Sequence, residues 1–423
     1  MSVRKHVLIC AVACHPSLGS EPAVGWQWVL RAAEKYRVTV VTADSRGSRT
    51  AIEDYRAANP DFAAWARFVY LAPFDTPPSI FVRKVRHHIP LFYYRAYRDW
   101  QKTAAAIAAD IARQESVDCV HQLTYITFRE PGFLDDLAVP FAWGPIGGTQ
   151  DVPWRFLLSL GVVDGIRNAV RNIVNLIQFR RTNRVAECFR RANALAAVAS
   201  DTRYLIKQQY GRDSTVIPAT ACSLPALLTQ QRSEETGVTR FVFTGAFVAR
   251  KGLPYALRAL SCLRDVKWTL DVIGRGRLEG RWKAIARRLG IADRVTFHGS
   301  VTRERAIEIM SHADAMVLPT LQEGWPTVIM ESLSLGVPVI TTNHHGMADQ
   351  VTPECGILLD LESPTQLVRD IAAALRTVAE NPVLRKKLAA GALERARHFS
   401  AGNQAAAIHR FYESAIDANV GSA

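Results

Sequence analysis

Two glutamates with a defined spacing lie in the segment LQEGWPTVIMESLSLGVPVITT, residues 321–342. Glu323 stands just before a Gly and a Pro, and Glu331 follows eight positions later among the apolar residues of a helix-like run. Burial of an unpaired carboxylate is costly or forces the group to take up a proton. The pattern therefore predicts that each acid meets a partner or a ligand.

The residues around these acids predict a buried strand, a loop and the start of a helix. Ala315–Leu318 has the composition of the strand, and Pro326 fits a first helical position, where no N–H donor is needed. The N–H groups of Thr327 and Val328 would then point out of the helix start, where they can bind a phosphate.

The two carboxylates would lie on either side of that phosphate. Glu331 comes one turn after Thr327 on the same helix face, from which it can accept hydrogen bonds from both hydroxyls of a ribose. Glu323, in the loop itself, would reach a sugar attached to the diphosphate. The alternative is that both acids are helix caps or members of surface ion pairs.

Two more loops follow short apolar strands in the same half of the chain. GAFVARKG, residues 245–252, places Arg250 and Lys251 before a helix that begins near Leu253, which is typical of an anion site. The alternative is a solvated basic turn. The GRG of residues 274–276 permits a tight turn and close approach of a ligand, but it is not a dinucleotide fingerprint.

The order of elements predicts two α/β domains, each with a doubly wound parallel sheet. A polar segment without periodicity predicts a linker near residues 218–238. We expect domains at residues 1–217 and 218–395, followed by a C-terminal helix, 396–423, that crosses back to the first domain. Expected strands are Val7–Val12, Val38–Thr42, Arg67–Leu71, Cys119–Gln122, Phe141–Trp143, Ala194–Val198, Thr215–Ile217, Phe241–Thr244, Trp268–Gly276 with its turn, Val295–Phe297, Ala315–Leu318 and Val339–Thr341.

Composition narrows the class of protein. With 423 residues, 48% hydrophobic and 22% charged, the chain is typical of a globular protein. Its seven cysteines include no Cys-x-x-Cys pair, which favours a reduced cytoplasmic compartment. The apolar start of MSVRKHVLICAVAC is better interpreted as a first strand than as a signal peptide. A formal charge of +13 implies an acidic partner, yet no recognisable nucleic-acid motif is present.

The Glu-x7-Glu pattern in EGWPTVIMESLSLGVPVITT resembles the signature of the retaining glycosyltransferases of family four. Their GT-B fold consists of two Rossmann-like domains that face each other across a cleft. GAFVARKG is similar to that family's phosphate loop, and the segments around GRG and HHGMADQVTPECGILLD also match. In the first half, GSEPAVGW resembles the family's flexible loop and WGPIGG resembles members that build bacterial surface polysaccharides. DCVHQLTY places His121 where the family carries a histidine near the donor sugar.

The resemblance implies a retaining glycosyltransferase that moves a hexose-type sugar from a nucleoside-diphosphate sugar to a glycan or lipid-linked glycan. No Asp-x-Asp metal motif is apparent, so transfer is expected to need no metal and no further cofactor. Two positions depart from the family pattern: Ala246 replaces an Arg and Asp349 replaces a Glu. The implied catalytic residues are His121, Glu323, Lys251 and Arg250, and the implied donor contacts are Gly19, Gly245, Gly274, Gly276, Gly324, Thr327, Val328 and Glu331.

Three alternatives stay open. The chain could be a sugar-nucleotide epimerase of the same fold, or a non-catalytic protein that binds a sugar nucleotide. Taken alone, a histidine such as His121 is more often a hydrogen-bonded structural residue, and only the surrounding motifs favour a catalytic role.

Two basic, aromatic stretches of the first half, Ser79–Lys102 and Trp154–Arg191, alternate apolar residues with Arg. They predict either surface helices that lie on an anionic membrane or solvated domain helices. The membrane interpretation, together with a lipid-linked acceptor, predicts a peripheral protein on the cytoplasmic face of the inner membrane.

Overall fold

The computed structural model describes residues 4–74, 90–222 and 237–420 and groups them into two compact units. The N-terminal unit comprises the described residues of Met1–Thr149, Leu176–Thr220 and Ala401–Ala423, and the second unit comprises those of Gln150–Asn175 and Ala221–Ser400. Most of the expected linker, residues 223–236, lies outside the described residues.

The segment 150–175 joins the second unit, although the sequence suggests a place in the first. Contacts across the second unit explain this: Gln322 Nε2 donates to Gln150 O at 2.7 Å, and the hydroxyls of Ser159 and Tyr255 lie 2.6 Å apart. Because such contacts join residues far apart in the chain, no local pattern reveals them.

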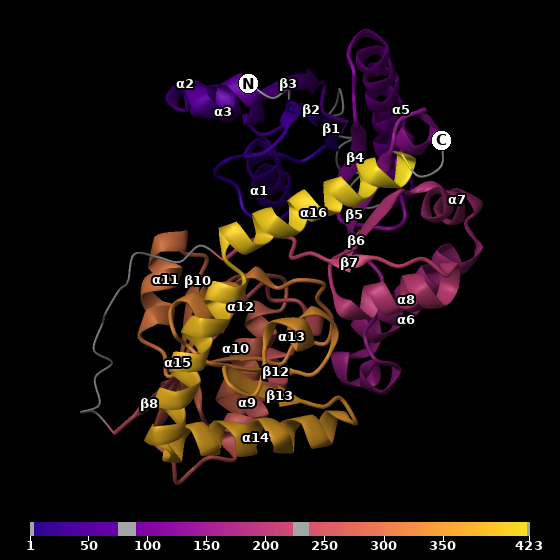
Figure 1. Cartoon of the computed structure of the whole chain (residues 1–423). Helices are drawn as coiled ribbons and strands as arrows, with labels where there is room; N and C mark the ends of the chain where they lie inside the picture. Colours follow the sequence, from indigo (N-terminus) through magenta and orange to yellow (C-terminus); the bar gives the residue numbers. More distant parts are fainter. Residues whose placement is uncertain (1–3, 75–89, 223–236, 421–423) are drawn as a thin grey trace. The chain divides into compact units, whose positions relative to one another are not determined.

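The N-terminal unit is built on a seven-stranded parallel sheet in the order β3-β2-β1-β4-β5-β6-β7 (Figure 1). Strands covered on both faces are nearly continuous apolar runs, as β1 and β5 are here. The strands are β1 (His6–Ala11), β2 (Arg37–Ala43), β3 (Ala66–Leu71), β4 (Cys119–Thr124), β5 (Phe141–Ile146), β6 (Ala194–Ala197) and β7 (Thr215–Val216).

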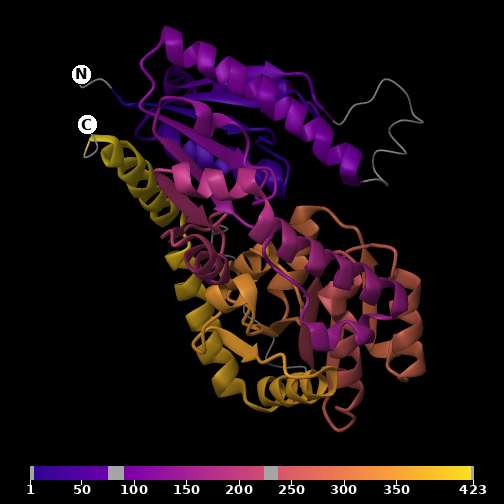
Figure 2. The ribbon, with the colours of Figure 1, turned by 90° about the vertical axis from the view of Figure 1, so that its right-hand side faces the viewer.

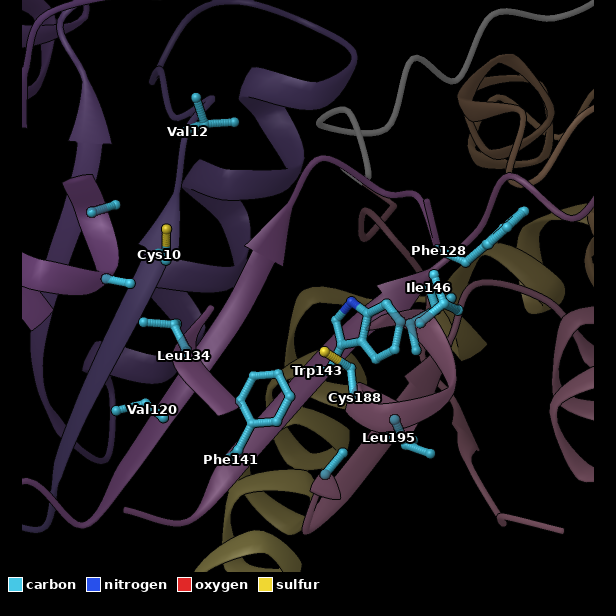
Figure 3. Packing of buried hydrophobic residues seen from close by; sticks show 14 of the residues in the cluster. Cys10, Val12, Val120, Phe128, Leu134, Phe141, Trp143, Ile146, Cys188 and Leu195 are labelled. Atoms are coloured by element: carbon cyan, nitrogen blue, oxygen red, sulfur yellow. The ribbon is translucent and has the colours of Figure 1, made fainter. Parts of the chain in front are cut away.

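Helices cover both faces of this sheet, and α5 and α16 lie along different sides of it (Figure 2). Tyr97 and Trp100 of α5 belong to a buried core cluster that also contains Trp143 and Phe141. Figure 3 shows Trp143 and Phe141 in this cluster. The other face carries α1 and α16, which contact each other. The helices are α1 (Glu21–Ala33), α2 (Ser48–Ala58), α3 (Pro60–Trp65), α5 (Pro90–Gln114), η1 (Leu134–Asp136), α7 (Asn183–Arg191), α8 (Ser200–Tyr210) and α16 (Ala401–Val420).

The second unit has a six-stranded parallel sheet in the order β10-β9-β8-β11-β12-β13 (Figure 1). The strands are β8 (Thr239–Thr244), β9 (Trp268–Ile273), β10 (Val295–Gly299), β11 (Ala315–Leu318), β12 (Val339–Thr342) and β13 (Gly356–Leu359). The strands expected from the sequence do not include β13. Both sheets confirm the expected α/β class of two Rossmann-like units.

In the second unit, α9 contacts α10 and α14, α12 contacts α11, α13 and α15, and α14 also contacts α15. Among the described residues, no helix has both the length and the apolarity needed to cross a bilayer. The elements are η2 (Trp154–Phe156), η3 (Leu158–Leu160), η4 (Ala249–Lys251), α9 (Leu253–Ser261), α10 (Glu279–Arg288), η5 (Ala292–Arg294), α11 (Arg303–Ser311), α12 (Thr327–Ser334), α13 (His345–Gln350), α14 (Pro364–Glu380) and α15 (Pro382–His398), while α6 (Val162–Arg181) has residues in both units.

Candidate functional site

The loops that follow β8, β9 and β11 meet at one edge of the second sheet, because parallel strands end on the same side. Phe247 N donates to Arg275 O at 2.9 Å, and Leu321 N donates to Arg250 O at 2.8 Å. Gly274, with φ +131°, allows this approach, since a Cβ there would collide with the carbonyl oxygen of Gly245. The loops are thus packed backbone against backbone.

Arg250, Lys251 and Glu323 form a charged cluster where the first and third of these loops touch. Lys251 Nζ lies 2.8 Å from Glu323 Oε1, and Arg250 forms a second ion pair with the same carboxylate. Arg250 also donates to Gln322 O at 2.8 Å, which holds the two loops together. The sequence predicts all three charged residues, but it does not predict that they pair with one another.

The electrostatics of this cluster favour an anion. Burial raises the pKa of Glu323, but the charges of Lys251 and Arg250 outweigh burial and hold that pKa below its ordinary value. The acid is therefore ionised at neutral pH, and two cations share one anion, which leaves one net positive charge. Lys251 is followed by Gly252 and then by the N-terminus of α9, whose N–H groups add to the positive potential.

Helix α12 begins at Thr327, with Pro326 at the N-cap, one residue later than the sequence suggests. Thr327 is exposed, and the N–H groups at the helix start have no carbonyl in a preceding turn. Glu331 lies on this helix, partly exposed, and its Oε1 is 3.2 Å from Nε of Arg303 in α11. Arg303 cannot be predicted from the sequence, because nothing local links it to Glu331.

Gly276 and Gly346 also allow close packing in the second unit. A Cβ on Gly276 would lie 2.7 Å from Phe247 O, and the carbonyl oxygen of Gly324 touches the position of a Cβ on Gly346. Ala246, where the family pattern expects Arg, is exposed. Contact of these residues with a donor stays a prediction.

His121 does not have the surroundings of a catalytic histidine. It is fully buried in the N-terminal unit, on the sheet face covered by α1 and α16. Its Nδ1 lies 2.8 Å from the Tyr412 hydroxyl, and its Nε2 lies 2.7 Å from Gly144 O. Burial lowers the pKa of His121 to about 3, although the Gly144 carbonyl opposes this. These contacts favour the structural alternative, and a contact between His121 and a sugar stays a prediction.

The N-terminal unit has a pocket of its own beside Gly19, with a volume of about 220 Å³. Its lining includes His15, Glu21, Arg46 and Tyr125. Burial raises the pKa of Glu21 to about 7, although the N–H of Ile126 donates to the carboxylate at 3.2 Å and opposes the rise. The sequence indicates the GSEPAVGW loop but not Glu21, because burial of this acid depends on the chain around residue 126.

The first predicted membrane stretch, Ser79–Lys102, is only partly described. Residues 79–89 lie outside the described residues, and Tyr97 and Trp100 are buried in the core. In the described parts of the chain, no three His, Cys, Asp or Glu side chains gather as a metal site would need.

Known proteins resemble this chain in sequence and in fold. Residues 226–395 match the family described as "Glycosyl transferases group 1". The lipopolysaccharide core biosynthesis glycosyltransferase LpsD of Rhizobium meliloti (strain 1021) is 30% identical over 190 residues, which are 44% of this chain and 53% of that protein. The first curated relatives are matched over as little as 28% of their length.

Two solved structures share the fold at 14% identity. The lipopolysaccharide outer core galactosyltransferase WaaB, in its apo form, has a TM-score of 0.64 over 99% of this chain and 100% of the other. HepE (Alr3699) of Anabaena, in complex with UDP-glucose, has a TM-score of 0.55 over 97% and 99%. The GT-B fold and the resemblance to glycosyltransferases are thereby confirmed.

Proposed function

From the match of residues 226–395 to the group 1 glycosyl transferases, we propose that this protein is a glycosyltransferase that uses a nucleoside-diphosphate sugar as its donor. The observation that carries the proposal is the cluster of Lys251, Arg250 and Glu323 at the carboxyl ends of β8 and β11. Such a site offers cations, helix N–H groups and an ionised acid within one cluster of loops.

Each part of the site has a role toward the donor. Lys251 and Arg250 bind the diphosphate, and the helix N–H groups of Thr327 and Val328 add donors for it. Glu331 accepts hydrogen bonds from the ribose hydroxyls, with Arg303 fixing its direction. Glu323 binds hydroxyls of the transferred hexose and keeps the two cations in place. The UDP-glucose complex of HepE, which has a similar fold, supports a donor of this class.

Transfer is proposed to retain the configuration of the anomeric carbon. The bond from that carbon to the diphosphate oxygen breaks, and the acceptor oxygen bonds to the same carbon on the same face. The acceptor proton passes to the departing diphosphate. Lys251, Arg250 and the helix N–H groups stabilise the charge on the leaving group, so we propose that no metal is required.

The proposed acceptor is a glycan or a lipid-linked glycan used in bacterial surface polysaccharide synthesis. Similarity to LpsD supports this class. An enzyme with such a substrate would work at the cytoplasmic face of the inner membrane.

The test is product formation by the full-length protein with a panel of UDP-, GDP- and ADP-sugars, with and without a lipopolysaccharide-type acceptor. We expect sugar transfer only when acceptor is present, and little loss of rate with EDTA. An altered sugar nucleotide formed without acceptor would identify an epimerase instead. If EDTA abolished sugar transfer and magnesium or manganese restored it, the metal-independent mechanism would be overturned.

A further inference from the structure

Helix α6 presents its apolar side to solvent and its polar side to the protein. Val162, Ile166 and Val170 are 79%, 61% and 56% exposed, and they recur on one face of the helix. Asp164 and Asn172, on the other face, are buried. This is the reverse of an ordinary surface helix, which buries its apolar stripe.

Specific bonds fix the helix in this orientation. Asp164 forms an ion pair with Arg277, and Asn172 Nδ2 donates to Val152 O at 2.7 Å. Asn175 Nδ2 donates to Asp151 Oδ1, also at 2.7 Å. Rotation of the helix to bury its apolar side would break these bonds and leave the charge of Asp164 without its partner Arg277. The apolar side therefore stays outward.

The exposed apolar side chains are concentrated in one segment of the chain. Among the described residues, all exposed large hydrophobic side chains except Tyr204 and Val383 lie between residues 154 and 177. Leu158 and Trp154, just before the helix, extend the patch and are 94% and 59% exposed. Single exposed apolar residues are ordinary, but a contiguous patch marks an interaction surface.

The charges around the patch indicate what covers it. Arg155, Arg167, Arg180 and Arg181 are exposed, whereas the acid within α6, Asp164, is buried and paired. A second copy of the chain would bring arginines against arginines, which costs energy. A bilayer interface with anionic lipid takes up the apolar face and pairs with the arginines at once.

We propose that the apolar face of α6, extended by Trp154 and Leu158, inserts into the interface of an anionic membrane. The helix lies parallel to the bilayer surface, with its arginines at the level of the lipid phosphates. This inference does not depend on the reaction proposed above, and its test contains no sugar nucleotide.

The test is flotation of the full-length protein with vesicles of phosphatidylcholine alone or with about one third phosphatidylglycerol. Wild type should float with the anionic vesicles and be partly released by salt. The double variant Ile166→Glu/Val170→Glu should lose at least about tenfold in binding, because two apolar side chains can no longer be buried. Val383→Glu, which changes an exposed valine outside the patch, should bind like wild type.

A third variant and a measurement of mass distinguish membrane binding from misfolding and from self-association. Because Leu158 is 94% exposed and lies in the short η3 outside α6, Leu158→Glu repeats the test if the double variant fails to fold. Equal loss with Val383→Glu, or no flotation of wild type, would overturn the proposal. A wild-type dimer in light scattering that becomes a monomer in the double variant, without vesicle binding, would show that a second copy covers the patch.

Discussion

Lys251 Nζ lies 2.8 Å from Glu323 Oε1, and this ion pair joins the loop after β8 to the loop after β11. Arg250 binds the same carboxylate. One acid thus positions both cations of the proposed diphosphate site, and it can bind the sugar as well. Substitution of Glu323 should therefore change the turnover rate without a matching loss of nucleoside-diphosphate affinity.

We predict that Glu323→Gln lowers kcat by about 10²–10³-fold, the scale for loss of one electrostatic contact to a transition state. Nucleoside-diphosphate affinity should be unchanged or higher, because the two cations lose their internal counterion. Steady-state kinetics and calorimetry measure the two effects. Glu279→Gln, which alters an acid paired with Lys283 on α10, is the control and should change neither. Wild-type turnover in Glu323→Gln would make this acid structural.

Glu331→Ala should weaken nucleoside-diphosphate binding by about 1.5–3 kcal/mol, the cost of lost charge-assisted hydrogen bonds. Binding of inorganic pyrophosphate should not change, because it has no ribose. Arg303→Ala should have a smaller effect, since its pair with Glu331 is largely exposed. Equal weakening of both ligands by Glu331→Ala would contradict a ribose contact.

His121→Ala should act on stability and not on chemistry. Loss of its contacts with Tyr412 and Gly144 should lower the free energy of unfolding by about 2–4 kcal/mol in urea titrations. The rate per folded molecule should stay within a few-fold of wild type. Tyr412→Phe, which removes a single hydroxyl, should cost less. A large fall in kcat with normal stability would restore a catalytic role for His121.

Glu21 makes stability depend on pH. Burial raises its pKa from 4.5 to about 7, so between these values the folded state binds more protons than the unfolded state. Stability from this group therefore falls as pH rises through that window. Glu21→Gln should remove this pH dependence. The melting temperature of the variant should therefore rise relative to that of wild type as the pH increases from about 5 to about 8. If the melting temperatures of wild type and Glu21→Gln differed by the same amount at every pH, the raised pKa would be contradicted.

The sequence predicts those parts of this protein that depend on local patterns. Apolar runs predict twelve of the thirteen strands found in the described residues, and β13 is the strand that they do not predict. The charged loop residues are also found, because each follows a strand. What the sequence does not show is pairing at a distance, such as Glu331 with Arg303.

Burial accounts for the places where sequence and structure differ most. His121 follows an apolar run, as a site residue would, but strand alternation turns its side chain into the layer between β4 and α16. The pattern of α6 shows an amphipathic helix, yet a pattern does not say which side faces the protein. Only the bonds of Asp164 and Asn172 decide that.

The central claim is that the cluster around Lys251 binds the diphosphate of the donor. Calorimetric titration of the full-length protein with UDP, GDP and ADP tests it most directly. We predict that at least one of these binds, and that Lys251→Ala weakens its binding at least about tenfold, as expected for loss of a charge-assisted contact. Lys283→Ala, a control on α10, should leave that affinity unchanged. Failure of all three nucleotides to bind, or equal affinity in wild type and Lys251→Ala, would contradict the account.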